Sequence, residues 1–399
     1  MSAWPTVLLG EVCTVVGGGT PTRTNPEYYG SEIPWVTPKD MKRWNIAESQ
    51  VSLTKLGLEK SAARLVPEGS VLIVVRSGVL KHTLPVGLAR VQVAINQDMK
   101  ALLCNPAVDP DYLARYIKSR SNVILKWVRA TTADNFSIDK LKQLRVPLPP
   151  ISEQRRIAAI LDHVDALRAK RREALAQLKE VTQAIFVDMF GDLGAGQTLW
   201  PETSLADLLL GIDSGKSPVC LTRSANLDEY GVLKLSAVTT GVFDQNQNKA
   251  LPEDAVPDVR HEVEGGDLLF TRKNTGVLVA ASAVVRQVRP KLLIPDLIFR
   301  LRIDPNRQIE ALYLQAAMMH PPVRKRIQGL AGGSAGSMPN ISKAKLRTVA
   351  LPHPPRTLQV EFGERVEHIE LLKSHNRSAL AELDSLFASL QSQAFQGEL

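Results

Sequence analysis

Cysteine, aromatic residues and long apolar runs are all scarce in this chain of 399 residues. Its three cysteines, Cys13, Cys104 and Cys220, lie far apart and form no C-x-x-C pair. This spacing argues against a disulfide scaffold and a structural zinc site, and favours a reducing cytoplasm. No apolar run approaches the roughly 18 residues of a membrane helix. The first residues lack the charged and apolar regions of a secretory signal, so we expect none.

The charge balance is basic, with 49 lysines and arginines against 41 acidic residues and a net charge of +8. A basic surplus permits nucleic-acid binding through phosphate contacts and counterion release. Many basic proteins bind no DNA, however, so charge alone identifies no function. The length exceeds that of one ordinary core and suggests two domains or more.

The second half of the chain repeats the first with a period of about 200 residues. The matching segments, first half and then second, are 8–21 with 205–218, 68–73 with 265–270, 135–141 with 340–346, and 146–150 with 351–355. Short apolar runs bounded by glycines predict buried strands in both halves, and segments 112–117 and 310–319 predict short helices. The sequence therefore predicts an α/β (α+β) fold with a twofold internal repeat.

A long helix is predicted after each proline-rich stop. From the expected N-cap Ser152 to Phe190 no proline or glycine occurs, and Gly191 stands where a C-cap belongs. The second helix is expected from Thr357 to Gly397. Helices of roughly 38 residues would span on the order of 55 Å, enough to separate two DNA-binding heads by about one and a half turns.

A 3-4 spacing of apolar residues gives each helix a seam, along which we expect antiparallel pairing. The predicted pairing residues are Ile157, Val164, Leu167, Leu178 and Ile185 in the first helix, and Phe362, Val366, Ile369, Leu380, Leu383 and Phe387 in the second. Polar residues interrupt both seams near the middle, at Arg171, Lys373 and Asn376. They either fix the register or extend from the edge of the seam to water.

Motifs for catalysis fail in their spacing. Residues 211–217 miss the phosphate-binding G-x4-G-K-[ST] pattern by one residue. Residues 109–112 read D-P-D-Y and lack the second proline of the adenine-methyltransferase motif. No E-x-K element of a nuclease occurs, and the seven histidines show no ligand spacing. We therefore expect no catalytic centre and no metal site in this chain.

The junction 146–157, which reads VPLPPISEQRRI, resembles the start of the long helix in specificity (S) subunits of type I restriction–modification systems. Segments 18–21, 28–30 and 33–35 resemble a widespread recognition domain of that family. The second junction departs from the pattern, because Leu358 replaces the glutamate before Gln359. The resemblance extends over essentially the whole chain.

This resemblance implies two target recognition domains, residues 1–150 and 192–355, each binding one half of a split DNA site. Spacer helices in 151–191 and 356–399 would set the distance between the half-sites. The implied partners are double-stranded DNA, two methyltransferase subunits docked on the helices, and restriction/translocase subunits, with no membrane. S-adenosylmethionine, ATP and Mg²⁺ would belong to those subunits, and no cofactor to this chain. The low similarity of the two bodies predicts an asymmetric site.

Residues that contact DNA are expected in polar loops, as phosphate contacts or as readers of base edges. Arg76 and Arg272 come first, because the repeat places each directly after a buried strand. The full set is Thr20, Arg23, Lys39, Lys42, Arg43, Arg76, Ser77, Lys81, His82, Asn96 and Gln97 in the first body, and Lys216, Ser217, Lys234, Ser236, Arg272, Lys273 and Asn274 in the second. For each of them a solvated surface group is an equal alternative.

Three other functions stay open. The chain resembles equally the specificity subunit of a related bipartite system whose partner fuses methylation and cleavage. A coiled-coil adaptor that binds no DNA is the second alternative, and sequence-selective DNA binding would exclude it. A self-sufficient enzyme is the third, and methyl transfer by the purified chain alone would support it.

Overall fold

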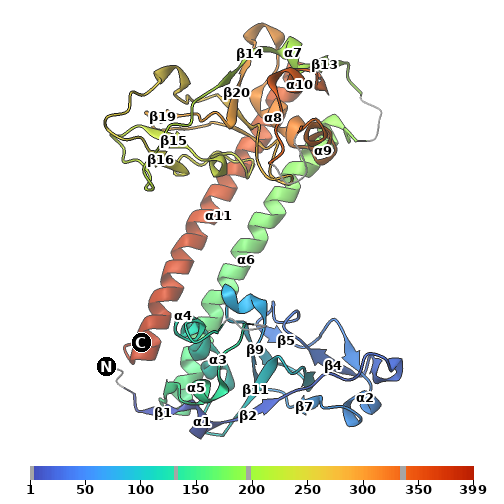
Figure 1. Cartoon of the computed structure of the whole chain (residues 1–399), viewed down its shortest axis with the longest axis vertical. Helices are drawn as coiled ribbons and strands as arrows, with labels where there is room; N and C mark the ends of the chain where they lie inside the picture. Colours follow the sequence, from blue (N-terminus) through green and yellow to red (C-terminus); the bar gives the residue numbers. More distant parts are fainter. Residues whose placement is uncertain (1–3, 130–133, 195–198, 333–337) are drawn as a thin grey trace. The chain divides into compact units, whose positions relative to one another are not determined.

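The computed structural model describes residues 4–129, 134–194, 199–332 and 338–399. It forms two compact units, Met1–Glu173 with Arg377–Leu399, and Ala174–Asn376. Each unit holds one body and parts of both long helices, α6 (Ile151–Phe190) and α11 (Arg356–Gln396) (Figure 1). The four-part division at 150, 191 and 355 stays a prediction, and the compact units divide the chain differently, within the helices.

The first body contains two five-stranded sheets and a two-stranded ribbon. In sheet order the strands are β3 (Tyr29–Gly30), β6 (Ser52–Leu53), β4 (Ile33–Val36), β10 (Val93–Ile95) and β7 (Arg64–Val66); then β2 (Cys13–Gly17), β11 (Met99–Cys104), β8 (Val71–Val74), β9 (Val86–Ala89) and β5 (Asn45–Ile46); and β1 (Thr6–Leu8) with β12 (Arg145–Pro147). The helices are α1 (Leu9–Val12), α2 (Lys55–Glu59), α3 (Pro110–Ser119), α4 (Ser121–Leu125) and α5 (Ile138–Lys142). β8 is buried along its whole length between β11 and β9, as its apolar run predicts.

The second body repeats this plan with fewer strands. In sheet order the strands are β14 (Leu209–Ser214), β20 (Ile298–Ile303), β17 (Leu268–Thr271) and β18 (Ser282–Val284); then β16 (Asn248–Ala250), β15 (Gly231–Leu233) and β19 (Leu292–Leu293); and β13 (Glu202–Ser204) with β21 (Ala350–Pro352). The helices are α7 (Leu205–Leu208), α8 (Ala311–Met319), α9 (Pro321–Gly329) and α10 (Lys343–Arg347). The mixed α+β fold and the twofold repeat are confirmed.

A buried tyrosine in each body ties its first longer helix to the two-stranded ribbon. The hydroxyl of Tyr112 on α3 donates to the carbonyl of Pro147, and that of Tyr313 on α8 donates to the carbonyl of Pro352. Burial raises the pKa of each hydroxyl above its usual range, so both stay protonated donors. The repeat therefore extends to individual hydrogen bonds.

The ends of the long helices agree closely with the sequence. α6 begins at Ile151, so Ser152 is its second residue and not its N-cap. Gly191 follows α6 with φ 80°, and Gly397 follows α11 with φ 84°. A left-handed glycine after the last turn is a common helix terminator. Among the described residues, no helix has the length and apolar character needed to cross a membrane.

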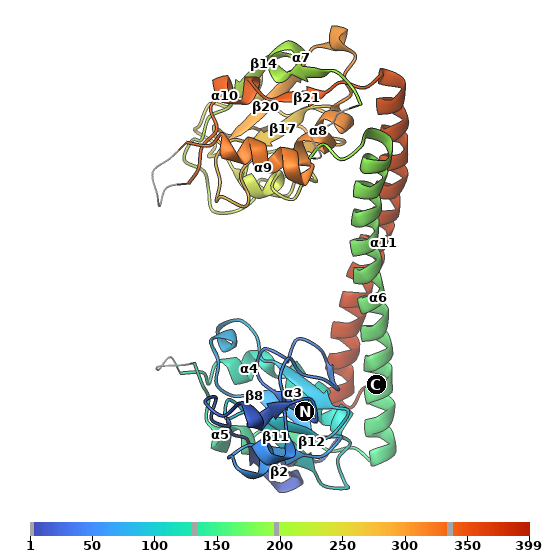
Figure 2. The ribbon, with the colours of Figure 1, turned by 90° about the vertical axis from the view of Figure 1, so that its right-hand side faces the viewer.

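α6 and α11 pack antiparallel within each unit, and their ends contact the bodies (Figure 2). In the first unit Arg156 donates to the carbonyl of Leu399 at 2.9 Å, and twelve positions further along α6 Arg168 donates to Asp384 at 2.6 Å. In the second unit the rings of Phe190 and Phe362 lie 5.4 Å apart. The predicted antiparallel pairing is therefore observed in both units.

Most of the predicted pairing residues lie in the seam. Those that are buried or half-buried are Ile157, Val164, Leu178, Ile185, Phe362, Val366, Ile369, Leu380, Leu383 and Phe387. The prediction was wrong for Leu167, which is 37% exposed. Arg168 takes that seam position, with its guanidinium 4.4 Å from the Phe387 ring. Arg171, the expected polar interruption, is exposed, so Arg168 is the seam cation of the first unit.

Lys373 is the corresponding seam cation of the second unit, as the sequence predicted. It is buried, and its ammonium donates to Thr182 on α6 at 3.1 Å and to Glu370 at 2.8 Å. Arg168 likewise pairs with an acidic residue three positions earlier, Asp165, at 2.8 Å. Directed polar contacts of this kind favour one register over neighbouring ones.

Candidate nucleic-acid interface

A buried glutamine fixes each body to the start of a long helix. The Gln154 side chain accepts from the amide of Asp109 at 2.8 Å and donates to the carbonyls of Ala107 and Pro149 at 2.9 and 2.8 Å. Its side chain is fully buried. All its polar atoms therefore serve the junction between loop and helix.

Gln359 makes the same three bonds in the second unit. It accepts from the amide of Glu310 at 2.8 Å and donates to the carbonyls of Gln308 and Pro354 at 3.2 and 2.8 Å. Both copies of the junction thus keep the glutamine together with its three hydrogen bonds. The preceding glutamate, present only in the first copy, pairs with Arg156 on the helix surface, and that bond lowers the pKa of Glu153.

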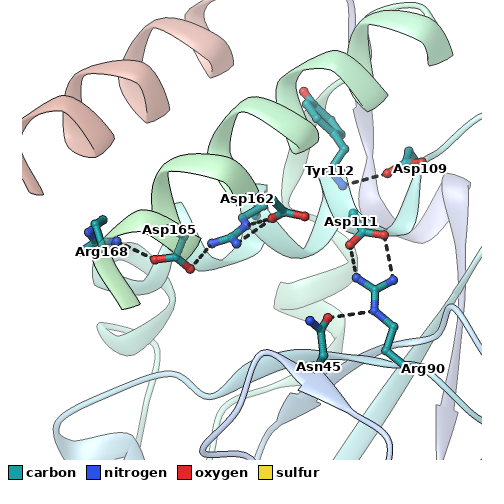
Figure 3. Close-up of polar contacts among 9 residues, drawn as sticks. Asn45, Arg90, Asp109, Asp111, Tyr112, Asp162, Asp165 and Arg168 are labelled. Atoms are coloured by element: carbon teal, nitrogen blue, oxygen red, sulfur yellow. Dashed lines mark hydrogen bonds and ion pairs between the residues drawn. The ribbon is translucent and has the colours of Figure 1, made fainter. Parts of the chain in front are cut away.

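Arg115 adds a second tie in the first unit. Its buried guanidinium reaches from α3 to Asp162 at 2.6 Å and Asp165 at 3.0 Å on α6. Asp165 also pairs with Arg168, which continues the chain of charges along the helix (Figure 3). In the same view Arg90 joins Asp111, the first-turn acid of α3, to Asn45. These contacts hold the sheet and its covering helix against α6.

In each body, loops that contain predicted DNA-contacting residues begin at the carboxyl ends of two parallel strands. β4 and β10 run parallel in the first body, with Val36 opposite Ile95. β15 and β19 run parallel in the second, with Val232 opposite Leu293. The carboxyl ends of parallel strands share an edge, so the loops that follow each pair begin side by side. In each body these loops carry several of the predicted contacts.

A glycine brings a third loop against this edge in both bodies. A Cβ at Gly18 would overlap the carbonyl oxygen of Ile95, and a Cβ at Gly215 would overlap that of Ile294. Only glycine permits such an approach of one backbone to another. Two residues later, Thr20 donates to the Gln97 side chain and Ser217 donates to Asp296.

At equivalent positions of the repeat, Thr20 therefore bonds to an amide side chain, that of Gln97, and Ser217 bonds to a carboxylate, that of Asp296. Thr20, Gln97 and Ser217 are exposed, as side chains that meet DNA must be. The backbone frame is the same and the hydrogen-bonding groups differ. Such a pair of sites suits two different base sequences.

Arg76 lies against the loop that follows β10, two residues beyond the end of β8. Its guanidinium is about half exposed and its Nε donates to Asp98 at 2.5 Å. Ser77 caps the short turn 78–81, and the ammonium of Lys81 lies 3.9 Å from Asp134. The carboxylate of Asp98 holds Arg76 in place and leaves its terminal nitrogens available.

Arg272, the counterpart after β17, has a different environment. Its guanidinium lies 5.3 Å from the centre of the Phe299 ring, and the amide of Ile341 donates to its carbonyl at 2.8 Å. Its Nε is buried with no hydrogen-bond partner among the described residues. Lys273, next in sequence, is half-buried.

Two predicted base readers support loops instead. Asn96 is buried, and its side chain bonds to the amide and carboxylate of Asp98. Asn274 is also buried, and its amide oxygen accepts from the amide of Thr275 at 2.8 Å. Their polar groups are satisfied inside the protein, so the structure revises their role from base contact to loop support.

The remaining predicted residues stay candidates by position alone. Those that are exposed are Arg23, Lys39, Lys42, Arg43, His82, Lys216 and Ser236, and Lys234 is half-buried. Arg43 pairs with Glu48, and Ser236 donates to Gln247 at 2.9 Å. Lys216 lies 3.3 Å from Asp258. Surface pairs of this kind are weak and open readily to a competing phosphate.

A basic cavity of about 420 Å³ in the second body escaped the sequence analysis. Its lining includes the basic residues Arg260, Arg300, Arg302 and Lys343 and the acidic residue Asp213. Arg300 and Arg302 lie on β20, and their spacing of two places both on one face of the strand. This alternation was the signal in the sequence. Arg260 comes from a distant loop that only the fold brings to the strand.

Residues 1–180 match the family described as the type I restriction modification DNA specificity domain. These residues are therefore similar to a type I DNA specificity domain. The resemblance noted at the junction before α6 is thereby confirmed, and the second half of the chain shares its plan through the internal repeat.

Two relatives from Escherichia coli illustrate the likeness. The EcoR124I/EcoR124II type I restriction enzyme specificity subunit is 38% identical over 183 residues, which are 45% of this chain and 45% of that protein. The EcoEI specificity subunit is 31% identical over 185 residues, 45% of this chain and 31% of that protein. In these matches the chain covers less than half the length of each relative.

A solved structure extends the likeness in fold to the whole chain. The type I restriction–modification S subunit from M. genitalium matches with a TM-score of 0.60 and 15% identity, over 99% of this chain and 96% of that one. This chain and that S subunit therefore share a fold.

Proposed function

We propose that this chain is the DNA-sequence-specificity subunit of a type I restriction–modification complex, in which each body binds one half of a bipartite, asymmetric site. The observation that carries the proposal is the repeated edge, where one backbone frame presents different side chains. In the first body the Thr20 hydroxyl donates to the Gln97 side chain, and at the corresponding place in the second body the Ser217 hydroxyl donates to Asp296. The chain would recognise the DNA sequence, and partner subunits would carry out the reaction in the cytoplasm.

The helices would set the spacing of the half-sites. α6 and α11 are each fixed at the start by a buried glutamine and at the end by aromatic packing, with Phe190 on Tyr313 and Phe395 on Tyr112. A helix held at both ends transmits its length to whatever those ends hold. Partner methyltransferase subunits would carry S-adenosylmethionine, and restriction subunits would carry ATP and Mg²⁺.

Genome-wide mapping of methylated adenines tests the specificity proposal. Cells that express this chain with a methyltransferase subunit of the type I class are compared with cells that express the methyltransferase alone. We expect a split, asymmetric motif that disappears without this chain. An unchanged pattern from a methyltransferase shown to be active would favour the adaptor hypothesis instead.

Exposed apolar residues on the helices support two equivalent docking surfaces for methyltransferase subunits, one in each unit. When the two helix sequences are aligned on their buried glutamines, Leu167 is equivalent to Leu372 and Val181 is equivalent to Leu386. All four side chains are exposed, between 37% and 50%. Each unit holds one residue from each helix, Leu167 with Leu386 and Leu372 with Val181. Repeated exposed apolar positions mark protein contacts better than scattered ones do.

The double variant Leu167→Asp/Leu386→Asp is expected to weaken one of two methyltransferase contacts by at least about thirtyfold, the effect of losing a contact worth about 2 kcal/mol. Native mass spectrometry of the co-expressed complex should then show one bound copy where the unaltered chain binds two. Val256→Asp, which alters an exposed valine of the second body, serves as the control and should keep both copies. Two copies on the double variant would exclude this surface.

A further inference from the structure

The basic cavity of the second body has a surplus of positive charge at its mouth. Arg300 is used internally, because its guanidinium donates to the carbonyls of Glu262 and Arg260 and pairs with Asp213. Arg302 is 54% exposed and lies 3.5 Å from the same carboxylate. Lys343 is exposed as well. Arg300 is held by Asp267 as well as Asp213, whereas the exposed Arg302 and Lys343 are available to an anion.

The cavity is continuous with the loops predicted to contact DNA. Asp258 lies 3.3 Å from Lys216 and 2.8 Å from Arg260, so it joins the glycine loop to the cavity wall. On the other side, Lys343 lies 5.6 Å from the Phe299 ring, against which Arg272 also packs. The cavity thus occupies the space between two groups of candidate contacts within one body.

The first body has no such cluster at the corresponding positions. Leu269 pairs with Arg300 across β17 and β20, and its counterpart Leu72 pairs with Ala101 across β8 and β11. Two residues further along, Leu103 stands where Arg302 does. The arginines are therefore an addition to the second body and not part of the shared frame.

We propose that this cavity is a phosphodiester-binding site, in which Arg302 and Lys343 hold a backbone phosphate of the DNA beside the half-site bound by the second body. The inference rests on the proposed function and specifies the ligand at one part of its surface. Guanidinium and ammonium groups on a preformed wall are the protein groups that phosphate oxygens prefer. A contact to phosphate positions the duplex and carries no base sequence. The second body would therefore hold DNA more tightly than the first.

The test compares the full-length chain with Arg302→Ala/Lys343→Ala and with Arg307→Ala. Arg307 is a matched control, because it is 55% exposed, lies in the same body and pairs with one aspartate at 3.7 Å. Binding to a mixed-sequence duplex is measured across a range of salt concentrations. For the double variant we expect affinity about tenfold weaker and a salt slope shallower by about one, as for one lost phosphate contact. The control should match the unaltered chain.

Four results would overturn the inference in distinguishable ways. Equal affinity and slope in all three proteins would exclude the cavity and leave the proposed function standing. A methylation motif altered at the second half-site by the double variant would indicate base reading instead. Tight binding of inorganic pyrophosphate, with duplex affinity unchanged in the double variant, would assign the cavity to a free phosphate. Failure of the unaltered chain to bind any duplex would overturn the proposed function as well.

Discussion

Gln154→Leu is expected to lower the free energy of unfolding of the first unit by about 3 to 5 kcal/mol. Leucine has a similar size but leaves the amide of Asp109 and the carbonyls of Ala107 and Pro149 without their partner. Each unsatisfied buried group costs about 1–3 kcal/mol. Differential scanning calorimetry should show the transition of this unit shifted to lower temperature.

The matched control for this variant is Gln183→Leu, the same substitution at an exposed position of the same helix. It should leave the transition within about 0.5 kcal/mol of the original. Gln359→Leu should reproduce the loss in the second unit, where the same three bonds exist. A Gln154→Leu protein as stable as the Gln183→Leu control would show that water replaces the side chain at the junction.

The extent of the helices was predictable because the signals are local. Proline pairs, the following glycines and apolar periodicity all act within a few residues of the feature that they predict. The seam of α11 follows the predicted residues from Phe362 to Phe387, including the polar interruption at Lys373. The seam of α6 departs from its apolar residues at Arg168, which occupies the position that its neighbour Leu167 was expected to fill. A polar seam residue is recognisable only with its partner on the other helix.

The candidate interface divides in the same way. The repeat alone placed Arg76 and Arg272 after buried strands, and the structure agrees. The burial of Asn96 and Asn274 depends on how their loops fold back, which no local pattern states. The basic cavity depends on pairing between β14, β17 and β20. Its residues are separated by long stretches of sequence, so only the fold brings them together.

The attachment of each body also depends on distant segments. Phe395, near the end of the chain, packs edge-on against Tyr112 and Tyr116 of the first body. Phe190, at the end of α6, packs the same way on Tyr313 of the second. Each body is therefore completed by the end of a helix that starts in the other half of the repeat. Each half of the repeat therefore needs an aromatic side chain from the other half to complete its core.

Gly18→Ala is expected to abolish recognition of the first half-site and to leave the second intact. The new Cβ would overlap the carbonyl of Ile95, a backbone atom that cannot move without shifting β10. Overpacking of this kind costs about 1–3 kcal/mol or more. The least costly relief is separation of the two loops, which breaks the bond between Thr20 and Gln97. Loss of the contacts to one half-site should weaken binding of the complete site at least about a hundredfold.

Gly78→Ala is the control for this change, because a Cβ there meets no atom within 4 Å in the same body. Binding is measured on duplexes that carry both half-sites, the first alone or the second alone, as the methylation map defines them. The Gly18→Ala protein should bind the complete site no better than the second half-site alone, and the Gly78→Ala protein should keep the full difference. If Gly18→Ala still distinguished the complete site, the meeting of these loops would not be where the first body reads DNA.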